Sequence, residues 1–480
     1  MNHSGLSLLT DLYQLTMAQA YWSADMAEHE AVFHLFYRKN PFKGGFAISC
    51  GLEDATSFLE AFTFDESDIG YLSTLKGADG QSLFQNGFLE WLGEMRFSCE
   101  VDAIPEGTLV FPHEPILRIQ GPLIQCQLLE TALLNILNFQ TLIATKAARI
   151  CLAANGEDVL EFGLRRAQGI NGGLAASRAA YVGGCVATSN VLAGKLFDIP
   201  VRGTHAHSWV MCFDDEITAF ETYADSLPNN CVFLVDTYDT IQGVRHAIEV
   251  GEALQRRGHA LLGIRLDSGD LADLSIKARK LLDEAGFHDA KIVASNDLDE
   301  YRITQLKEEG AEIRVWGVGT RLATAYDQPA LGGVFKLAAI RAKGDSWQYR
   351  VKLSEQAIKV SNPGIQQVRR FIKDGKIYAD MIHHEPDTSR ATAFSTFSGE
   401  EVQVEGQESM ELLHPIFRNG KKVYQSPSVH AVRENCLLQL SQLSDSVKKL
   451  NNPSTFPVGL EPQLLSLKRS LIQRYRPTNM

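Results

Sequence analysis

The sequence predicts an α/β fold: an irregular (β/α) barrel with a flanking antiparallel α+β domain built from both ends of the chain. Three observations support this prediction. In the middle of the chain, short apolar runs rich in β-branched residues alternate with amphipathic helical patterns. The alternation repeats roughly every 30 residues, which is the period of a (β/α) barrel. Nearer both ends, short alternating strands and hairpin turns replace that pattern.

Six apolar runs are the strands that we expect in the barrel, and they lie at 158–163, 199–204, 231–237, 259–267, 291–295 and 312–319. Amphipathic patterns at 241–258 and 271–286 lie between them, and each ends on a glycine, the residue favoured just past a helix C-terminus. A doubly wound open sheet would show the same alternation. The pattern alone therefore favours the barrel without excluding the open sheet.

The flanking domain is predicted from strands and helices at both chain ends. Strands are expected at 31–41, 46–52 and 108–121, around helices near 53–62 and 65–75. Hairpin-like strands follow the barrel at 347–354, 366–384 and 421–425. We place the α+β domain at 1–125 plus 340–430, the barrel at 126–339 and a helical C-terminal tail at 431–480.

Composition and charge exclude several classes of function. A formal net charge of −12 at pH 7 argues against a nucleic-acid partner, because phosphate backbones are bound through a basic surface. No apolar stretch reaches the roughly 20 residues that span a bilayer, and the N-terminus lacks the pattern of a signal peptide. The 8 cysteines form no CxxC pair, which argues against a zinc ribbon. We therefore expect a cytoplasmic enzyme with reduced thiols and no membrane partner.

Polar residues and glycines follow each of the six predicted strands. In a barrel, the loops after the C-terminal ends of the strands carry the chemistry. Any one of these ends alone would fit a helix cap or a turn. Together, with three arginines among them, they favour a site for an anionic ligand. In chain order the residues are Arg165, Arg166, Thr204, His205, His207, Asp236, Asp239, Arg265, Asp267, Ser268, Asp270, Ser295, Asn296, Asp297, Gly317, Gly319 and Thr320.

Two of these strand ends suit anions in different ways. The run VWGVGT at 315–320 ends on two glycines and a threonine, so its backbone N–H groups can approach a phosphate closely. Ordinary turn glycines are an equal alternative there. The run IRLDSGD at 264–270 places one guanidinium among three carboxylate or hydroxyl groups. Arginine binds a planar carboxylate or a phosphate through two parallel hydrogen bonds, and a structural Arg–Asp pair is the alternative.

The run GTHAHS at 203–208 contains a pair of histidines. His205 and His207 are two residues apart and share a face if the segment is extended. A carboxylate can orient one ring nitrogen while the other acts as a nucleophile or a base. A structural histidine and a metal ligand are the alternatives. The chain has no HExxH motif and no third ligand at a fixed spacing, so the pattern disfavours a histidine metal site.

A series of long motifs runs in order from about residue 8 to residue 430: LLTDLYQLTMAQAYW, FYRKNPFKGGFAISCGLEDA, EFGLRRAQG, TSNVLAG, GTHAHSW, VDTYDT, IRLDSGD, ASND and VWGVGT. These motifs resemble the successive signatures of the nicotinate phosphoribosyltransferase family. The resemblance implies a funnel-like irregular α/β barrel plus an α+β domain, and a homodimer with active sites at the subunit interface. It does not cover the final helical tail.

The resemblance implies a reaction and its catalytic residues. Nicotinate and 5-phosphoribosyl 1-pyrophosphate would be joined into nicotinate mononucleotide in NAD salvage, with ATP hydrolysed and Mg²⁺ as the cofactor. His207 would be the histidine that ATP phosphorylates, and Asp236 would be its carboxylate partner. Phosphorylation adds roughly two negative charges near the site, so differential binding to the two forms can couple ATP cleavage to product formation.

The resemblance also implies which residues bind the substrates. Phe162 and Tyr13, the latter from the other subunit, would sandwich the pyridine ring, and Arg265 with Thr204 would receive the nicotinate carboxylate. The residues for the phosphoribosyl group and the other phosphates would be Arg38, Lys39, Arg165, Asp267, Ser268, Gly317, Gly319 and Thr320. One departure from the family pattern is GGCVATSN, where Val186 stands at a usually acidic position.

Several rival functions are weighed against this one. In nicotinamide phosphoribosyltransferase, the nearest rival, an acid accepts from the amide, and Ser189 stands at the matching position here. Quinolinate phosphoribosyltransferase is shorter and needs no ATP. A catalytically silent binding protein would not need His207, Arg265, Asp267 and Thr320 together. An aldolase would need a Schiff-base lysine at a strand end, and the six ends carry none.

Overall fold

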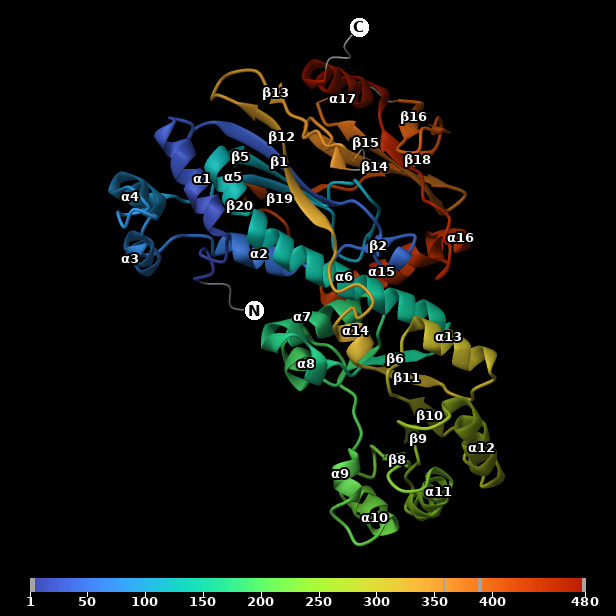
Figure 1. Ribbon diagram of the computed structural model, residues 1–480. Helices are drawn as coiled ribbons and strands as arrows, with labels where there is room; N and C mark the ends of the chain where they lie inside the picture. The colour runs from blue at the N-terminus through green and yellow to red at the C-terminus, as the bar shows by residue number, and fades with distance from the viewer. Residues whose placement is uncertain (1–4, 357–358, 387–390, 477–480) are drawn as a thin grey trace. The chain divides into compact units, whose positions relative to one another are not determined.

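The computed structural model describes residues 5–356, 359–386 and 391–476, and the chain divides into two compact units (Figure 1). Unit 1 comprises Met1–Leu142 and Ala330–Met480, and unit 2 comprises Ile143–Pro329. The first division falls inside one long helix, α6 (Glu130–Ala154). The boundaries between the units lie at 142/143 and 329/330, whereas 125/126 and 339/340 were predicted. The C-terminal tail belongs to unit 1 and is not a separate domain.

Unit 2 is built on a sheet of six parallel strands. The strands are β6 (Asp158–Glu161), β7 (Ala187–Thr188), β8 (Val232–Leu234), β9 (Gly263–Leu266), β10 (Lys291–Ala294) and β11 (Val315–Val318), in the order β7-β6-β11-β10-β9-β8. The strand β8 pairs with β9, β9 pairs with β10, and β10 pairs with β11, which in turn pairs with β6. Every step goes in one direction around the sheet, which is the winding of a barrel and not that of a doubly wound sheet.

The ring of strands is open between β7 and β8, because neither has a further partner strand among the described residues. The predicted strand at 199–204 makes only an isolated parallel bridge, Thr188 with Val201. Pro200 lies within this run and has no N–H to donate, which limits a ladder. The structure thus confirms a mixed α/β fold with a curled parallel sheet, and the irregular barrel expected for this part of the chain stays a prediction.

The helices of unit 2 connect and cover these strands. They are the 3-10 turn η2 (Leu164–Arg166) and the helices α7 (Gly169–Val182), α8 (Val191–Phe197), α9 (His207–Val210), α10 (Glu216–Ser226), α11 (Thr240–Arg256), α12 (Leu271–Glu284), α13 (Glu300–Glu308) and α14 (Thr320–Ala323). Asp239 and Asp270 accept hydrogen bonds from the first-turn N–H groups of α11 and α12. Two of the polar strand ends are therefore ordinary helix caps.

Unit 1 contains two larger sheets and one short strand pair. The first sheet is antiparallel, in the order β13 (Gln348–Tyr349), β12 (Gly333–Arg341), β1 (Glu30–Tyr37), β5 (Leu117–Pro122), β3 (Glu100–Ala103), β19 (His414–Arg418), β20 (Lys421–Lys422). The short pair joins β2 (Ala47–Ile48) to β4 (Leu109–Val110). The helices before residue 130 are α1 (Leu12–Ser23), α2 (Leu52–Glu60), α3 (Glu66–Thr74), α4 (Asn86–Glu94) and α5 (Leu123–Leu128), and a 3-10 turn, η1, spans Pro41–Lys43.

The second sheet of unit 1 takes one strand from the C-terminal tail. Its order is β17 (Glu401–Gln403), β16 (Ala393–Thr396), β21 (Val458–Leu460), β15 (Lys376–His384), β14 (Gln366–Lys373), β18 (Glu408–Glu411). The strand β21 runs parallel to β15 and antiparallel to β16. The tail also forms α15 (Val429–Gln442), α16 (Asp445–Lys448) and α17 (Pro462–Tyr475). The tail expected to be helical therefore also contains a short strand at 458–460, between its helices.

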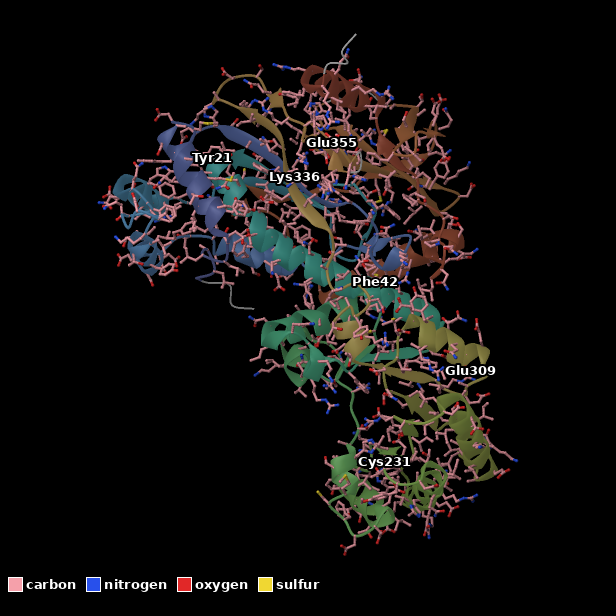
Figure 2. All side chains as sticks on the ribbon, viewed as in Figure 1. Tyr21, Phe42, Cys231, Glu309, Lys336 and Glu355 are labelled. Carbon is pink, nitrogen blue, oxygen red and sulfur yellow. The ribbon has the colours of Figure 1, made fainter. Side chains whose placement is uncertain are left out.

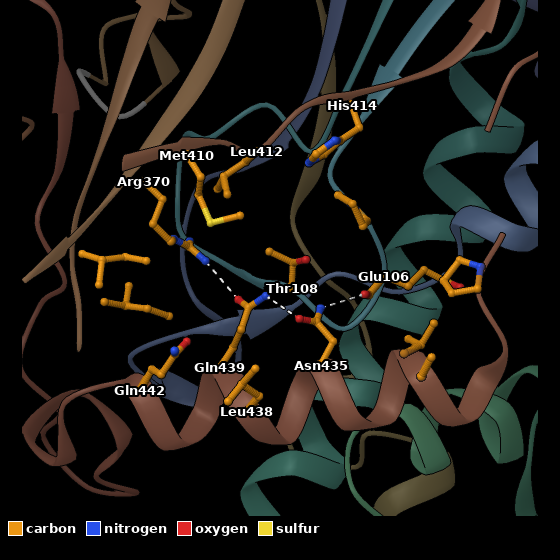
Figure 3. Close-up of a pocket in the computed structure, with 16 residues that line it drawn as sticks. Glu106, Thr108, Arg370, Met410, Leu412, His414, Asn435, Leu438, Gln439 and Gln442 are labelled. Carbon is orange, nitrogen blue, oxygen red and sulfur yellow. Dashed lines mark hydrogen bonds between the residues drawn. The ribbon is translucent and has the colours of Figure 1, made fainter. Parts of the chain in front are cut away.

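The helix α15 is held against unit 1 by a chain of side-chain hydrogen bonds beside a cavity of about 490 Å³ (Figure 3). Arg370 donates to Gln439 at 3.1 Å, and Gln439 donates to Asn435 at 3.1 Å. Asn435 in turn donates to the carbonyl oxygen of Glu106 at 3.4 Å. Arg370 is buried and also forms an ion pair with Asp380, at 2.5 Å. These contacts explain why the tail packs as part of unit 1.

Candidate active site

The candidate site lies in unit 2, at the edge of the sheet where its parallel strands end. Because the carboxyl ends of parallel strands meet at one edge, residues far apart in the sequence come together there. Three hydrogen bonds show this: Arg265 near the end of β9 donates to Thr204, Ser268 after β9 donates to Asp236 after β8, and Ser295 after β10 donates to Asp267. The loops predicted to carry the chemistry are thus joined to one another.

The two histidines of GTHAHS have different environments. His205 is 7% exposed and packs against the rings of Phe220, Tyr223 and Phe233. Its Nε2 accepts a hydrogen bond from the backbone N–H of Leu234 at 3.2 Å. Burial lowers the pKa of His205 to about 4, so the ring is neutral at neutral pH. His205 is therefore a structural residue of the core, which was one of the alternatives considered for the GTHAHS histidines.

His207, in contrast, is half-buried and faces the polar strand ends. Its Nδ1 lies 3.1 Å from Oγ1 of Thr237, and its Nε2 lies 3.9 Å from Oδ2 of Asp267. Asp236, the expected partner, uses its Oδ2 to accept from the N–H of Asp267, at 2.9 Å, and from the hydroxyl of Ser268, at 2.6 Å, so its role toward His207 stays a prediction. Asp236 positions the loop after β9, and Asp267 is the carboxylate within ion-pair distance of the histidine.

The guanidinium of Arg265 has a donor without a hydrogen-bond partner among the described residues. One Nη1–H donates to Thr204 Oγ1 at 2.6 Å, whereas the buried Nε has no partner among the described residues. Burial lowers the pKa of Arg265, and the positive charge of Arg165 adds to this effect, while Asp267 and Asp236 oppose it. A guanidinium that is largely buried and only partly hydrogen-bonded is suited to an anionic ligand. Arg165, by comparison, is exposed on η2.

The predicted phosphate glycines also shape the position of Phe162. A Cβ on Gly317 would lie 2.8 Å from Cδ2 and Cε2 of the Phe162 ring, so the ring lies directly on the backbone of β11. A Cβ on Gly319 would lie 3.3 Å from the Phe162 carbonyl oxygen, and Thr320 follows as the first residue of α14. These glycines therefore allow two backbones to approach closely at the strand end.

Glu161 is a residue of the site that the sequence analysis missed. It is the last residue of β6 and is buried, yet it has no cationic partner among the described residues. Its oxygens accept hydrogen bonds from the N–H of Gly163, from Ser177 at 2.9 Å and from Thr188 at 2.6 Å. The N–H of Ser189 donates to the Glu161 carbonyl oxygen at 2.9 Å. Glu161 thus fixes the segments that contain Phe162 and Ser189.

A cavity of about 910 Å³ lies inside the curled sheet. Phe162 and Thr204 line it near the strand ends, and Asp158 and Lys291 line it near the strand starts. Its apolar lining comes from residues such as Val293, which is typical of sites for small aromatic ligands.

The remaining predicted site residues belong to unit 1. Tyr13, on α1, is 50% exposed, and its hydroxyl accepts from Gln14 Nε2 at 3.0 Å. Arg38 and Lys39 follow β1; Lys39 is exposed, and the buried Nε of Arg38 has no hydrogen-bond partner among the described residues. Within one chain, the predicted site residues of unit 2 therefore lie together, whereas Tyr13, Arg38 and Lys39 belong to unit 1.

The described residues were also compared with the patterns of metal sites, membrane helices and disulfides. Among residues 5–356, 359–386 and 391–476, no three His, Cys, Asp or Glu side chains are grouped as metal ligands. Over the same residues, no helix has both the length and the apolar character needed to cross a bilayer. None of the 8 cysteines, all of which lie in the described ranges, forms a disulfide, and Cys231 (Figure 2) is one of the buried ones.

Comparisons with known proteins agree with one another. Residues 8–138, 158–352 and 365–468 match the N-terminal domain, family and C-terminal domain models of nicotinate phosphoribosyltransferase. The match extends into the tail, which the motif resemblance did not cover. The chain is 44% identical to nicotinate phosphoribosyltransferase of Bacillus subtilis, with 98% of this chain and 96% of the relative aligned. It is 37% identical to the enzyme of that name from Dictyostelium discoideum, over 97% of this chain and 88% of the relative.

A solved structure supports the same assignment. Human nicotinic acid phosphoribosyltransferase superposes with a TM-score of 0.84 at 33% identity, covering 96% of this chain and 99% of the human chain. The identity and coverage of these relatives exceed what a shared fold alone would give. The chain belongs to the nicotinate phosphoribosyltransferase family of enzymes.

Proposed function

We propose that this enzyme transfers the phosphoribosyl group of 5-phosphoribosyl 1-pyrophosphate to nicotinate in NAD salvage, and that it couples ATP hydrolysis to the transfer through a phosphohistidine. The observation that carries the proposal is the partly hydrogen-bonded guanidinium of Arg265 in the sheet that also positions Phe162. Unit 2 thus contains a cation that can bind a carboxylate, an aromatic ring and a cavity, and binding of a small aromatic acid requires all three.

Nicotinate binding follows from these two groups. The carboxylate would accept two parallel N–H bonds from Arg265, and Thr204 holds that guanidinium in place through its hydroxyl. The pyridine ring would stack on Phe162, whose own position is fixed by its contact with Gly317. Ser189 near the ring carries no charge that would repel the carboxylate, in contrast to an acid at that position.

The phosphoribosyl group would lie along the neighbouring strand ends. Backbone N–H groups around Gly317 and Gly319, with the Thr320 hydroxyl, are suited to the 5-phosphate. Asp267 and Ser268 are suited to the ribose hydroxyls and Arg165 to a phosphate. Asp236 retains one buried oxygen without a partner in the described chain, so it would hold a Mg²⁺ bound mainly by substrate phosphates. The cation would supply positive charge to the leaving pyrophosphate.

The transfer itself needs positioning more than a protein nucleophile. The bond from ribose C1 to the pyrophosphate oxygen breaks with positive charge developing on the sugar, and the pyridine nitrogen supplies the electron pair of the new bond. The pyrophosphate leaves with the electrons of the broken bond. Arg165 and Arg265 contribute positive electrostatic potential on this side of the site. Orientation of the ring by Phe162 would keep the nitrogen aligned with C1.

Phosphorylation would occur on His207. If the ring donates from Nδ1 to Thr237, its lone pair is on Nε2, which then attacks the γ-phosphorus of ATP. The new N–P bond forms as the bond to the ADP oxygen breaks, and water later hydrolyses the phosphohistidine. His205 has its Nε2 engaged with the Leu234 N–H and is buried, so it does not compete for this role.

We also propose a homodimer in which Tyr13 and Arg38 of one subunit complete the site of the other. Unit 2 exposes apolar side chains on η2, α7 and α8, including Ile170 at 79% and Val191 at 71%. On unit 1, α1 and the residues before it expose Leu9, Leu12 and Met17. Apolar patches on both units fit burial against a second copy of the chain. Cysteines without disulfides fit a reducing compartment, the cytoplasm.

The test is a product assay with matched substrates. Purified protein is given nicotinate or nicotinamide with 5-phosphoribosyl 1-pyrophosphate and Mg²⁺, with and without ATP, and the mononucleotide is measured. We expect a strong preference for nicotinate and stimulation by ATP. Ser189→Asp should shift the preference toward nicotinamide, because it adds an acceptor for the amide and repels the carboxylate. Equal use of both pyridines by the wild type would instead favour a nicotinamide phosphoribosyltransferase.

A further inference from the structure

Unit 1 contains a group of basic side chains that the proposed mechanism leaves unexplained, and it includes a residue of the C-terminal helix. The group consists of Arg38 after β1, His113 between β4 and β5, and Lys468 on α17, and we call it the basic cluster. Contacts connect its members. The N–H of His113 donates to the carbonyl oxygen of Tyr37 at 2.8 Å, directly before Arg38.

Phe397 joins His113 to Lys468. The His113 and Phe397 ring centroids are 4.6 Å apart, and Nζ of Lys468 is 5.7 Å from the centroid of the same ring. The ammonium also donates to Asn362 Oδ1 at 2.8 Å. The ammonium is therefore held by two neutral groups, and Phe397 connects it to the His113 ring.

The basic cluster lacks a counter-charge. Neither Arg38 nor Lys468 forms an ion pair with a carboxylate within the described part of the chain, and the buried Nε of Arg38 has no hydrogen-bond partner there. Burial lowers the pKa of Lys468 to about 8, so the ammonium is mostly charged at neutral pH. Burial, followed by the charges of Lys468 and Arg38, lowers the pKa of His113 to about 4, so this ring is a neutral hydrogen-bond donor.

Partly buried cations are normally paired, because removing their hydration is costly. Here two cations lie near enough to a neutral imidazole to affect its pKa, and neither cation is paired with a carboxylate among the described residues, so a multivalent anion would satisfy them. Burial lowers the pKa of Lys336 on β12 (Figure 2), Glu130 at 4.0 Å opposes this shift, and the charge of Arg38 adds to it. Three donors of different geometry suit the several oxygens of a phosphate group.

We propose that Arg38, His113 and Lys468 form a binding site for a phosphate group, to which the C-terminal helix α17 contributes Lys468. The site extends the phosphate role proposed for Arg38 and gives the tail a function. Its ligand is either a phosphate of the proposed substrates or free inorganic phosphate or pyrophosphate. The chemistry of recognition is the same for both, and the experiment separates them.

The test is calorimetric titration of the full-length chain with inorganic pyrophosphate. Lys468→Met keeps the length of the stem but removes the charge, Lys468→Arg keeps the charge, and Arg469→Met removes a charge from an exposed neighbour on the same helix. Losing one charged hydrogen bond in a desolvated site weakens binding about 10- to 150-fold. We expect that loss in Lys468→Met only, with a melting temperature at least as high as that of the wild type.

The outcomes separate the alternatives. Unchanged pyrophosphate affinity in Lys468→Met, or an equal loss in Arg469→Met, overturns the site. If the KM for ATP or 5-phosphoribosyl 1-pyrophosphate rises in parallel with the loss of affinity, the ligand is a substrate phosphate. If both KM values stay constant, the ligand is the free anion. A wild-type chain that binds pyrophosphate through Lys468 but makes no nicotinate mononucleotide would retain this site and refute the proposed function.

Discussion

Replacing Arg265 should remove the discrimination between nicotinate and nicotinamide. In the structure Thr204 occupies one donor of the guanidinium, and the buried Nε has no partner among the described residues. A nicotinate carboxylate can therefore accept two charged hydrogen bonds, whereas the oxygen of an amide accepts one. The difference is one charged bond in a desolvated site, worth about 1.5–3 kcal/mol, or roughly 10- to 150-fold in kcat/KM.

The assay measures kcat/KM for both pyridines at saturating 5-phosphoribosyl 1-pyrophosphate. Arg265→Ala should lower kcat/KM for nicotinate by about 100-fold or more and for nicotinamide much less, since two charged bonds are lost against one. Arg265→Lys is the matched control, because it keeps the charge and loses the planar fork, so an intermediate value is expected. A parallel loss for both pyridines would refute the reasoning and assign Arg265 to the phosphoribosyl group.

Three further predictions follow from the site. His207→Ala should abolish an acid-labile, base-stable label from radioactive ATP, and a label that survives would assign phosphorylation elsewhere. Mixing inactive Tyr13→Ala and Arg265→Ala chains should restore activity, because a mixed dimer has one intact shared site; inactive mixed dimers would place Tyr13 in its own subunit. The unfolded pKa of His205 is about 6.5 against about 4 when folded. The stability advantage of the wild type over His205→Gln should therefore be full above pH 6.5 and fall by about 3 kcal/mol toward pH 4 in urea titrations; a difference constant with pH would contradict the burial argument.

Hydrophobic periodicity was sufficient to predict the strands of unit 2 that are buried and regular. The runs at 231–237 and 291–295 contain β8 and β10, and the helical pattern at 241–258 contains α11. It missed β7 and β21, whose pairing depends on neighbours distant in the sequence.

The candidate site was predictable in its residue types but not in its pairings. Charge and spacing indicated that His207, Asp236 and Asp267 lie at neighbouring strand ends, and the structure brings these ends together. Which carboxylate faces the histidine depends on the turn after β9, where the N–H of Asp267 and the hydroxyl of Ser268 both donate to Asp236. Glu161 was missed because a lone acid inside an apolar strand has no partner in the local sequence. Its partners Ser177 and Thr188 are 16 and 27 residues away.

The position of β21 has a consequence for how this chain is made in the cell. Unit 2 is one continuous segment, so all of its strands are available once Pro329 has emerged from the ribosome. The second sheet of unit 1 lacks a middle strand until Leu460, 20 residues before the last residue of the chain, has been synthesised. Before that moment β15 and β16 both expose an unpaired edge to other nascent chains. A chain that stops before β21 would therefore contain all the strands of unit 2 together with an aggregation-prone unit 1.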